Sequence, residues 1–388
     1  MVYGDSYTES QDNIHSTLIK TRAPSDLQSI WRKAPSRVLL SCPDLFARLP
    51  FVFRRYSAYK ATRKIKHKHR TGCALRTTSL YMVQTTPRIF DRSAWQHNRD
   101  RAAAGYEKTA FLKELACARL AERLELVRRD FTDILDLGCH GGQMSAALPA
   151  RFHERSVKIT QTDPSAAFVQ RARVANPFVQ KNLVILDDIL PIAPASCDAV
   201  LSAIFLHWMN DLPGMLSQIC LALRPDGLLL ANMLGGRSLT ELRGCLAEAE
   251  IEICGGISPR CMPMADIREL GSLLQRAGFA LPVADAELVT VTYPDMFRLM
   301  ADIKAMGGQN CLFGRISHFT PRAVFMRAAA LYEQKFSHSG GQIKATVELI
   351  TLTGWAPDTS QPQPLRPGSA ANRLAEALGT TETPLKGG

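Results

Sequence analysis

The chain has 388 residues, 46% of them hydrophobic, which is enough to bury the core of one large domain and leaves residues for an extension or a lid. No stretch approaches the roughly 18 uninterrupted apolar residues of a membrane-spanning helix, so we expect no transmembrane segment. The net charge of +11 is concentrated in residues 1–81, with 15 Lys and Arg against 5 Asp and Glu, whereas the remaining residues hold 32 against 31, so we expect no nucleic-acid binding by the folded domain.

Residues 1–81 form a basic extension. The stretch from Leu45 to Tyr81 has no acidic residue and lacks apolar periodicity, which predicts a disordered or only locally helical segment. Three interpretations stay open: a transit peptide, an arm that binds nucleic acid or an anionic membrane, or translated upstream sequence with Met82 as the working start. We favour the third. The predicted domains are this extension, a folded domain over 82–355 with a helical insertion at about 295–336, and a loose tail over 356–388.

The folded region alternates predicted strands and helices. It begins with an amphipathic helix over 108–127, in which apolar residues recur at helical spacing. The expected strands are 134–137, 157–162, 183–186, 199–204, 228–233, 281–293 and 347–353, and the later helices are 238–251, 264–277, 295–306 and 321–336. Such alternation predicts an α/β fold with a seven-stranded, mostly parallel sheet, helices on both faces and a small helical lid between the last two strands.

Ten cysteines are scattered along the chain. They include no C-x-x-C pair, and no pair of histidines has the spacing of a metal site. We therefore expect reduced thiols and no bound metal.

The sharpest motif follows the first predicted strand. Asp136-Leu-Gly138-Cys139-His140-Gly141-Gly142 is a glycine-rich turn that enters a helix. Glycine lets the backbone approach a ligand that a Cβ atom would block, and free N–H groups at the start of the helix can bind a carboxylate. Taken alone, the motif is equally consistent with a structural turn.

Acidic residues follow the next two strands. Asp163 lies directly after the second strand, where its carboxylate can accept both hydroxyls of a ribose, and Asp187-Asp188 follows the third, where a carboxylate can accept the exocyclic amine of adenine. Taken singly, Asp163 is more often a helix cap or a turn residue, and Asp187-Asp188 is equally consistent with solvated loop acids. Together, at one edge of a parallel sheet, they predict a nucleoside pocket. The G-x-G-x-x-G spacing of dinucleotide sites is absent, which favours S-adenosyl-L-methionine over NAD.

These motifs, with Leu223-Arg-Pro-Asp-Gly227 before the fifth strand, resemble the successive motifs of class I methyltransferases. The resemblance implies the Rossmann-like class I methyltransferase fold with S-adenosyl-L-methionine as cofactor. It also implies the cofactor-binding residues Asp136, Gly138, Cys139, Gly142, Asp163, Asp187 and Asp188.

More specific segments resemble a narrower family, the mitochondrial complex I assembly factors that hydroxylate an arginine, with their alphaproteobacterial relatives. The segments are Ile89-Phe-Asp-Arg92, Leu206-His-Trp-Met-Asn-Asp-Leu-Pro213, Gly235-Gly-Arg-Ser-Leu-Thr-Glu-Leu-Arg243, Tyr293-Pro-Asp-Met-Phe297 and Gly354-Trp355. The resemblance covers about residues 88–370.

The sequence departs from the methyltransferase pattern at two places. His140 replaces the usual middle glycine of the turn, so we expect either a negative φ there or an imidazole that shapes the pocket. The acidic loop after the third strand is one residue short, which leaves open whether Asp187 or Asp188 meets the adenine.

His207 and Trp208 follow the fourth strand, from which this fold usually addresses its substrate, and they are the candidate catalytic residues. His207 is expected to act as a base or a substrate contact, and Trp208 as a wall beside the sulfonium. Packing of both side chains under the lid is the alternative.

The sequence thus predicts an S-adenosylmethionine-dependent methyltransferase that acts on a protein substrate connected with respiratory complex I assembly. A complex I subunit or a small-molecule methyl acceptor is the expected partner. An arginine hydroxylase of a complex I subunit and a non-catalytic, cofactor-binding assembly factor remain alternatives. Hydroxylation would need dioxygen and a reductant or metal, and no iron-binding triad is recognisable. The expected location is the cytoplasm, or alternatively the mitochondrial matrix, peripheral to the inner membrane.

Overall fold

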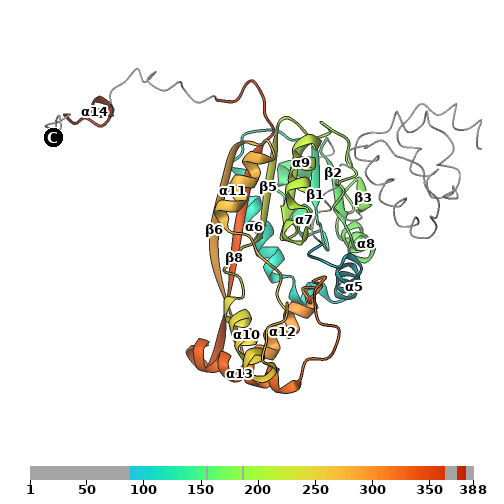
Figure 1. Ribbon diagram of the computed structural model, residues 1–388. Coiled ribbons are helices and arrows are strands. Elements are labelled where there is room, and N and C mark those ends of the chain that lie inside the picture. Colours follow the sequence, from blue (N-terminus) through green and yellow to red (C-terminus); the bar gives the residue numbers. More distant parts are fainter. Residues whose placement is uncertain (1–87, 154–155, 186–187, 363–373, 382–388) are drawn as a thin grey trace, which may run out of the picture. The chain divides into compact units, whose positions relative to one another are not determined.

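The computed structural model describes residues 88–153, 156–185, 188–362 and 374–381 (Figure 1). The predicted basic extension over 1–81 lies outside the described residues, as do residues 363–373 and 382–388 of the predicted tail.

One mixed sheet forms the centre of the described chain, and its strand order is β3-β2-β1-β4-β5-β8-β6. The strands are β1 (Asp133–Leu137), β2 (Lys158–Asp163), β3 (Lys181–Val184), β4 (Cys197–Ala203), β5 (Leu223–Leu234), β6 (Ala280–Tyr293), β7 (Ser337–His338) and β8 (Gln342–Trp355). Strands β1 to β5 pair in parallel, whereas β8 is antiparallel to both β5 and β6. The predicted fold class is confirmed. The described sheet has eight strands, one more than expected, because the two-residue β7 adds to the edge of β8.

Helices cover both faces of this sheet. The helices of the described residues are α5 (Arg92–Ala103), α6 (Phe111–Glu125), α7 (Gln143–Ala146), α8 (Ala166–Ala175), α9 (Leu212–Ala222), α10 (Thr240–Cys254), α11 (Ile267–Arg276), α12 (Met296–Ala305), α13 (Arg322–Phe336) and α14 (Leu374–Ala377), of which α14 belongs to the C-terminal tail and not to the layers on the sheet. Every helix expected from the sequence is present, with bounds that differ by a few residues.

The alternation of side chains along β1 separates the two cores. Leu135 and Leu137 join the core beneath α9 and α11, whereas Ile134 joins the core beneath α6 and α7. Because successive strand side chains point to opposite faces, Asp136 points to the same side as Ile134, and it binds Ser145 of α7. An acidic side chain is thereby buried at the end of a central strand.

The lid has its own hydrophobic core at one end of the sheet. Helices α12 and α13 form the predicted insertion, and α10 joins them against the ends of β6 and β8 (Figure 1). Leu242, Leu299 and Leu331, one from each lid helix, are buried in this cluster. The lid therefore contains three packed helices, one more than the predicted insertion supplies.

Helix α5 was not predicted from the sequence. Asp91 caps its N-terminus by accepting hydrogen bonds from the amides of Ser93 and Ala94. The helix has few apolar residues, and its buried side chains include Asn98 and Arg99, so apolar periodicity could not reveal it. Just before it, the Phe90 and Leu312 backbones form an antiparallel bridge that joins the start of the folded chain to the segment after α12.

Three properties of the described residues bear on the predictions. None of their helices is long and apolar enough to cross a membrane. Their eight cysteines are all free thiols. No group of three or more His, Cys, Asp or Glu side chains among them could hold a metal ion.

Substitutions in and beside α6 test how much the packing of this helix against the sheet stabilises the fold. The two positions are Leu120 and Leu126. Leu120 is fully buried, whereas Leu126, directly after the helix, is 82% exposed. We expect Leu120→Ala to lower the free energy of unfolding by about 2–5 kcal/mol because it leaves a cavity. Leu126→Ala should change it by less than about 0.5 kcal/mol. Denaturant unfolding of both variants measures the difference, and equal effects would contradict the packing described here.

Candidate functional site

The turns after β1, β2 and β3 meet at one edge of the sheet. The amides of Gly138 and Cys139 both donate to the carbonyl of Thr162, at 2.8 and 2.9 Å, and the amide of Ile185 donates to the carbonyl of Asp163 at 3.1 Å. The convergence predicted from the sequence is thus present in the structure.

The glycine-rich turn needs glycine at two positions for steric reasons. Gly138 has φ +79° and Gly142 has φ +91°, and an added Cβ would lie 2.1 Å from the Phe205 ring or 2.2 Å from Asn176 Nδ2, respectively. His140 between them has φ +49°, so the expected alternative of a negative φ is wrong. Its imidazole is buried and is among the residues that line the cavity described below, and its role in the cofactor pocket stays a prediction.

Asp136 and Cys139 are buried beside this turn. Asp136 Oδ2 accepts a hydrogen bond from Ser145 Oγ at 2.8 Å, whereas Oδ1 has no partner among the described residues. Burial raises the pKa of Asp136, and the nearby Lys113 ammonium opposes this shift. Burial also holds the pKa of the Cys139 thiol well above its usual value, so the side chain stays a neutral thiol.

The Asp163 carboxylate is fully buried and engaged by protein groups. Its Oδ1 accepts from Arg99 Nε at 3.2 Å and from the Ser165 amide at 2.9 Å. Its Oδ2 accepts from the His140 amide at 3.0 Å and from Arg99 Nη2. The carboxylate thus accepts four hydrogen bonds from the protein, two of them from Arg99, and its contact to a ribose stays a prediction.

His140 joins the same network through its ring. Arg99 Nη1 lies 3.0 Å from Nε2, and Nδ1 lies 3.0 Å from the Gly138 carbonyl. Because a guanidinium can only donate, Nε2 is the acceptor and the ring proton lies on Nδ1. Burial, with the Arg99 and Lys113 charges, holds the pKa of His140 well below its usual value, so the ring is neutral.

Lys113 is a second buried cation at this edge. Its Nζ donates to the carbonyls of Gly138 at 2.8 Å and Ala203 at 2.6 Å, which lie at the ends of β1 and β4. The side chain is 2% exposed although it lies on α6, because it occupies the apolar face of that helix with Ala116 and Leu120. A charge on that face was the sequence signal that could have identified Lys113.

The acidic pair after β3 is only partly described. Asp187 lies outside the described residues. The Asp188 carboxylate accepts from the amides of Asn210 and Asp211 and forms an ion pair with Arg92. These contacts tie the loop after β3 to the segment after β4, and binding of adenine by either aspartate stays a prediction.

His207 and Trp208 form a short 3-10 helix after β4. The amide of Leu234 donates to His207 Nδ1 at 3.5 Å, so the neutral ring carries its proton on Nε2, which has no partner among the described residues. Burial, assisted by the charges of Arg99 and Lys113, lowers the pKa of His207 to about 3. Such a ring is a poor base near neutral pH. A substrate contact and packing of the buried side chain under the lid both stay predictions for His207. Trp208 packs edge-on against Phe90, with ring centroids 5.4 Å apart.

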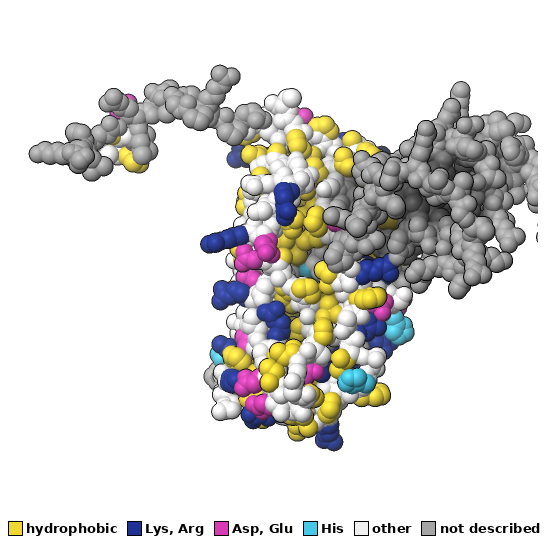
Figure 2. Space-filling view, viewed as in Figure 1, with side chains coloured by type: hydrophobic (Ala, Val, Ile, Leu, Met, Phe, Trp, Pro, Cys, Tyr) yellow, Lys and Arg dark blue, Asp and Glu magenta, His cyan; other side chains and the backbone are white. Residues whose placement is uncertain are grey.

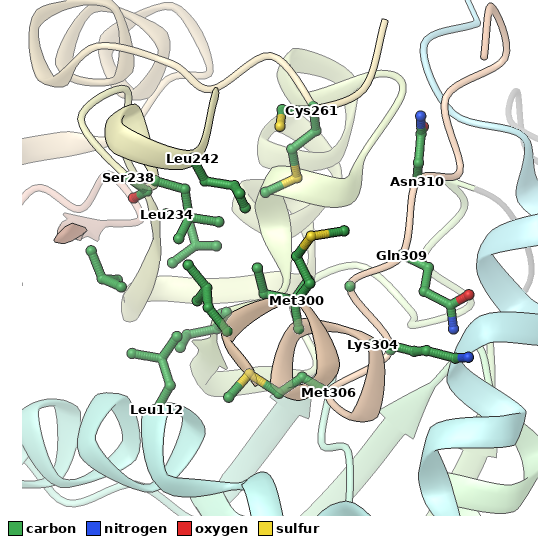
Figure 3. Close-up of a pocket in the computed structure, with 18 of the residues that line it drawn as sticks. Leu112, Leu234, Ser238, Leu242, Cys261, Met300, Lys304, Met306, Gln309 and Asn310 are labelled. Carbon is green, nitrogen blue, oxygen red and sulfur yellow. The ribbon is translucent and has the colours of Figure 1, made fainter. Parts of the chain in front are cut away.

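A cavity of about 520 Å³ lies between this edge of the sheet and the lid. Leu112, Leu234, Leu242 and Met300 extend into the same space, whereas Lys304 and Gln309 extend to one side (Figure 3). His207 and Trp208 line the cavity together with Arg99, Lys113 and His140. Gly138, Gly142 and Asp163 do not line it, so the hollow lies beside the three turns and Arg99 separates it from Asp163.

Comparisons with known proteins show what this chain is similar to. A methyltransferase domain model matches residues 135–231. "Arginine-hydroxylase NDUFAF5, mitochondrial" of Rattus norvegicus is 36% identical over 308 residues, which cover 78% of this chain and 88% of that protein. The Homo sapiens protein of the same name is 36% identical over 298 residues, 75% of this chain and 85% of that one. "Malonyl-[acyl-carrier protein] O-methyltransferase" of Methylovorus sp. (strain MP688) is 32% identical, covering 69% of this chain and 90% of its own. Among solved structures, the YcgJ protein from Bacillus subtilis aligns with a TM-score of 0.44 and 14% identity, over 62% of this chain and 98% of that one.

The neutral, buried His207 predicts a specific loss of stability in acid. The pKa of His207 is about 3 in the folded chain and about 6.5 when unfolded, so below pH 6.5 the unfolded state binds the extra proton and folding is opposed. At pH 5 this opposition amounts to about 2 kcal/mol. We expect His207→Gln to lose less unfolding free energy than the wild type between pH 7.5 and pH 5, by about that amount.

Denaturant unfolding at the two pH values measures this difference. His318→Gln is the matched control because His318 is exposed. If His207→Gln and the wild type lost the same free energy, the burial of a neutral His207 would be refuted.

Proposed function

This chain belongs to the class I methyltransferase family whose members include the mitochondrial arginine hydroxylases, and on that basis we propose that it is an enzyme whose substrate occupies the cavity beneath the lid. The cofactor is S-adenosylmethionine, as the methyltransferase domain over 135–231 indicates. We propose methyl transfer as the reaction. The observation that carries this proposal is the placement of His207 and Trp208 on the cavity wall, beside the edge where the three turns converge.

The residues at this edge fit the cofactor with one rearrangement. The positive φ of Gly138 and Gly142 opens the backbone of the turn, and the Asp136 carboxylate has an oxygen without a partner among the described residues. Asp163 has the chemistry to hold a ribose, but its four hydrogen bonds already include two from Arg99. Arg99 therefore has to release Asp163 before ribose hydroxyls can take its place.

The protein's own contribution to methyl transfer is alignment. When bound, the cofactor supplies a methyl group that its sulfonium already activates, so positioning of the acceptor accounts for most of the rate. Nε2–H of His207 donates a hydrogen bond to the substrate. The aromatic cluster of Trp208, Phe90 and Trp95 excludes water from that side of the cavity.

Arginine hydroxylation is the second candidate function. Two relatives that are 36% identical over 88% and 85% of their lengths carry that name, and their names place them in mitochondria. Insertion of one oxygen atom requires dioxygen and a two-electron reductant, neither of which S-adenosylmethionine supplies. For both candidate reactions we propose a complex I subunit as partner, with a small-molecule acceptor as the alternative for methyl transfer. The proposed location is the cytoplasm or, alternatively, the mitochondrial matrix.

Calorimetric titration of the full chain with S-adenosylmethionine tests the cofactor site. We expect Asp163→Asn to weaken binding at least about tenfold, because a neutral amide replaces a charged acceptor. The matched control is Asp285→Asn, which removes a half-exposed carboxylate paired with Arg123 on the surface. Unchanged affinity in a folded Asp163→Asn variant would contradict the assignment of Asp163.

Intact-mass analysis separates the candidate reactions. The full chain is incubated with S-adenosylmethionine and respiratory complex I subunits or small-molecule acceptors, and the products are weighed. Methyl transfer adds one methylene, whereas hydroxylation adds one oxygen. We expect the methylene. Binding of the cofactor with neither mass change would favour a non-catalytic assembly role.

A further inference from the structure

A strap over residues 255–266 joins α10 to α11 and forms part of the cavity wall. The strap contains no helix or strand. Four of its residues, Arg260, Cys261, Met262 and Met264, line the cavity (Figure 3). This part of the wall is therefore not held in place by secondary structure.

Backbone hydrogen bonds contribute little to the attachment of the strap. Over residues 256–264, no backbone group bonds to another backbone group of the described chain. Gly255 and Gly256 begin the strap, and a Cβ added to either glycine would meet nothing within 4 Å. At the other end, the Gly236 amide donates to the Ala265 carbonyl at 3.2 Å. A segment with few backbone bonds and unobstructed glycines at one end can open at a low cost in free energy.

Hydrogen bonds to one carboxylate hold the strap instead. Glu250 Oε1 accepts from Ser258 Oγ at 2.6 Å and from Arg260 Nη2 at 2.7 Å. Its Oε2 accepts from the Ser258 amide and from Arg260 Nε, each at 3.0 Å. The hydrogen bond from Arg260 lowers the pKa of Glu250 to about 2, so the carboxylate is ionised at neutral pH. Bidentate bonds between a guanidinium and a carboxylate are among the stronger hydrogen bonds of proteins.

Two further contacts join the strap to the loop after α12. Arg260 Nη1 donates to Thr320 Oγ1 at 2.9 Å, and Asn310 Nδ2 donates to the Pro259 carbonyl at 2.8 Å. Cys311, next to Asn310, lines the cavity and is 2% exposed. The strap thus closes against the segment that carries this buried thiol.

We propose that the strap is a hinged cover of the cavity, that the Glu250 carboxylate latches it shut, and that a ligand enters when the cover opens. Loss of one carboxylate releases four hydrogen bonds at once, and Gly255 and Gly256 allow the backbone to turn. Covers that open at a few hinge residues admit a ligand and then exclude water from it. That this ligand is the substrate rests on the proposed function, whereas the latch does not.

Thiol labelling of the full chain tests the latch. Samples are pulsed with N-ethylmaleimide at neutral pH, and the labelled peptides are weighed. Cys311 reports access to the cavity, whereas Cys139, which is fully buried and does not line the cavity, reports global unfolding. We expect Glu250→Gln to accelerate labelling of Cys311 at least about tenfold, with Cys139 unchanged, because the charged acceptor is lost. Unchanged labelling of Cys311 would overturn the proposal.

The matched control is Glu252→Gln, on the same helix. The Glu252 carboxylate is 40% exposed and pairs with Arg327 on the surface. Its loss should change the labelling of Cys311 by less than about twofold, because an exposed pair contributes little. Equal acceleration by Glu250→Gln and Glu252→Gln would assign the effect to α10 as a whole and overturn the latch.

Ser258→Ala decides the outcome if Glu250→Gln unfolds the chain and exposes Cys139 as well. This variant removes only the Oγ bond and keeps the pair of Glu250 and Arg260. We expect Cys311 to label at least about threefold faster, with Cys139 unchanged. No change at Cys311 would then overturn the proposal.

Calorimetric titration of the same samples with S-adenosylmethionine separates the cover from the proposed function. If the cofactor binds and Cys311 does not respond to Glu250→Gln, the cover is wrong and the proposed function stands. If Cys311 responds as expected and the cofactor does not bind, the cover stands and the proposed function has failed.

Discussion

Two buried cations hold the carboxyl edge of the sheet together. Arg99 of α5 binds the Asp163 carboxylate, and Lys113 of α6 binds the carbonyls of Gly138 and Ala203. Charges taken out of water remain stable only where their partners replace the lost hydration, and removal of one partner leaves the other uncompensated. These contacts bind α5 to the end of β2, and α6 to the ends of β1 and β4. Arg99 and Lys113 also form part of the cavity wall.

The same junction links the two halves of the site. Arg99 lines the cavity on one side and binds Asp163 on the other. A ligand in the cavity and a ligand at Asp163 would therefore both contact the Arg99 guanidinium. The surface that Figure 2 shows carries interspersed Lys, Arg, Asp and Glu side chains. The cavity, in contrast, is lined by basic charges alone among the described residues. Arg99 is nevertheless paired with the buried Asp163, and Arg260 with Glu250, and weak screening by solvent inside the fold makes such pairs strong.

Sequence patterns predicted the central sheet well, because buried strands are continuous apolar runs and their turns carry glycine and aspartate. The predicted run at 134–137 became β1 one residue longer, and the run at 281–293 became β6 with nearly the same bounds. Helix α5 escaped prediction since its buried side chains are polar. The sequence also did not decide the backbone conformation of His140. A positive φ at a non-glycine residue depends on the surrounding contacts and not on the residue type.

Local spacing alone was enough to place the three turns at one edge, since parallel strands joined by helices all end on the same side. Only the tertiary structure decided which side chains bind the polar groups at that edge. The contact between Arg99 and Asp163 joins residues 64 positions apart, and Lys113 reaches carbonyls 25 and 90 positions away. A buried cation can donate a hydrogen bond to any nearby oxygen. The packing of the folded chain therefore decides which oxygen becomes its partner. The neutral state of His207 depends on burial in the folded chain, so the sequence does not reveal it.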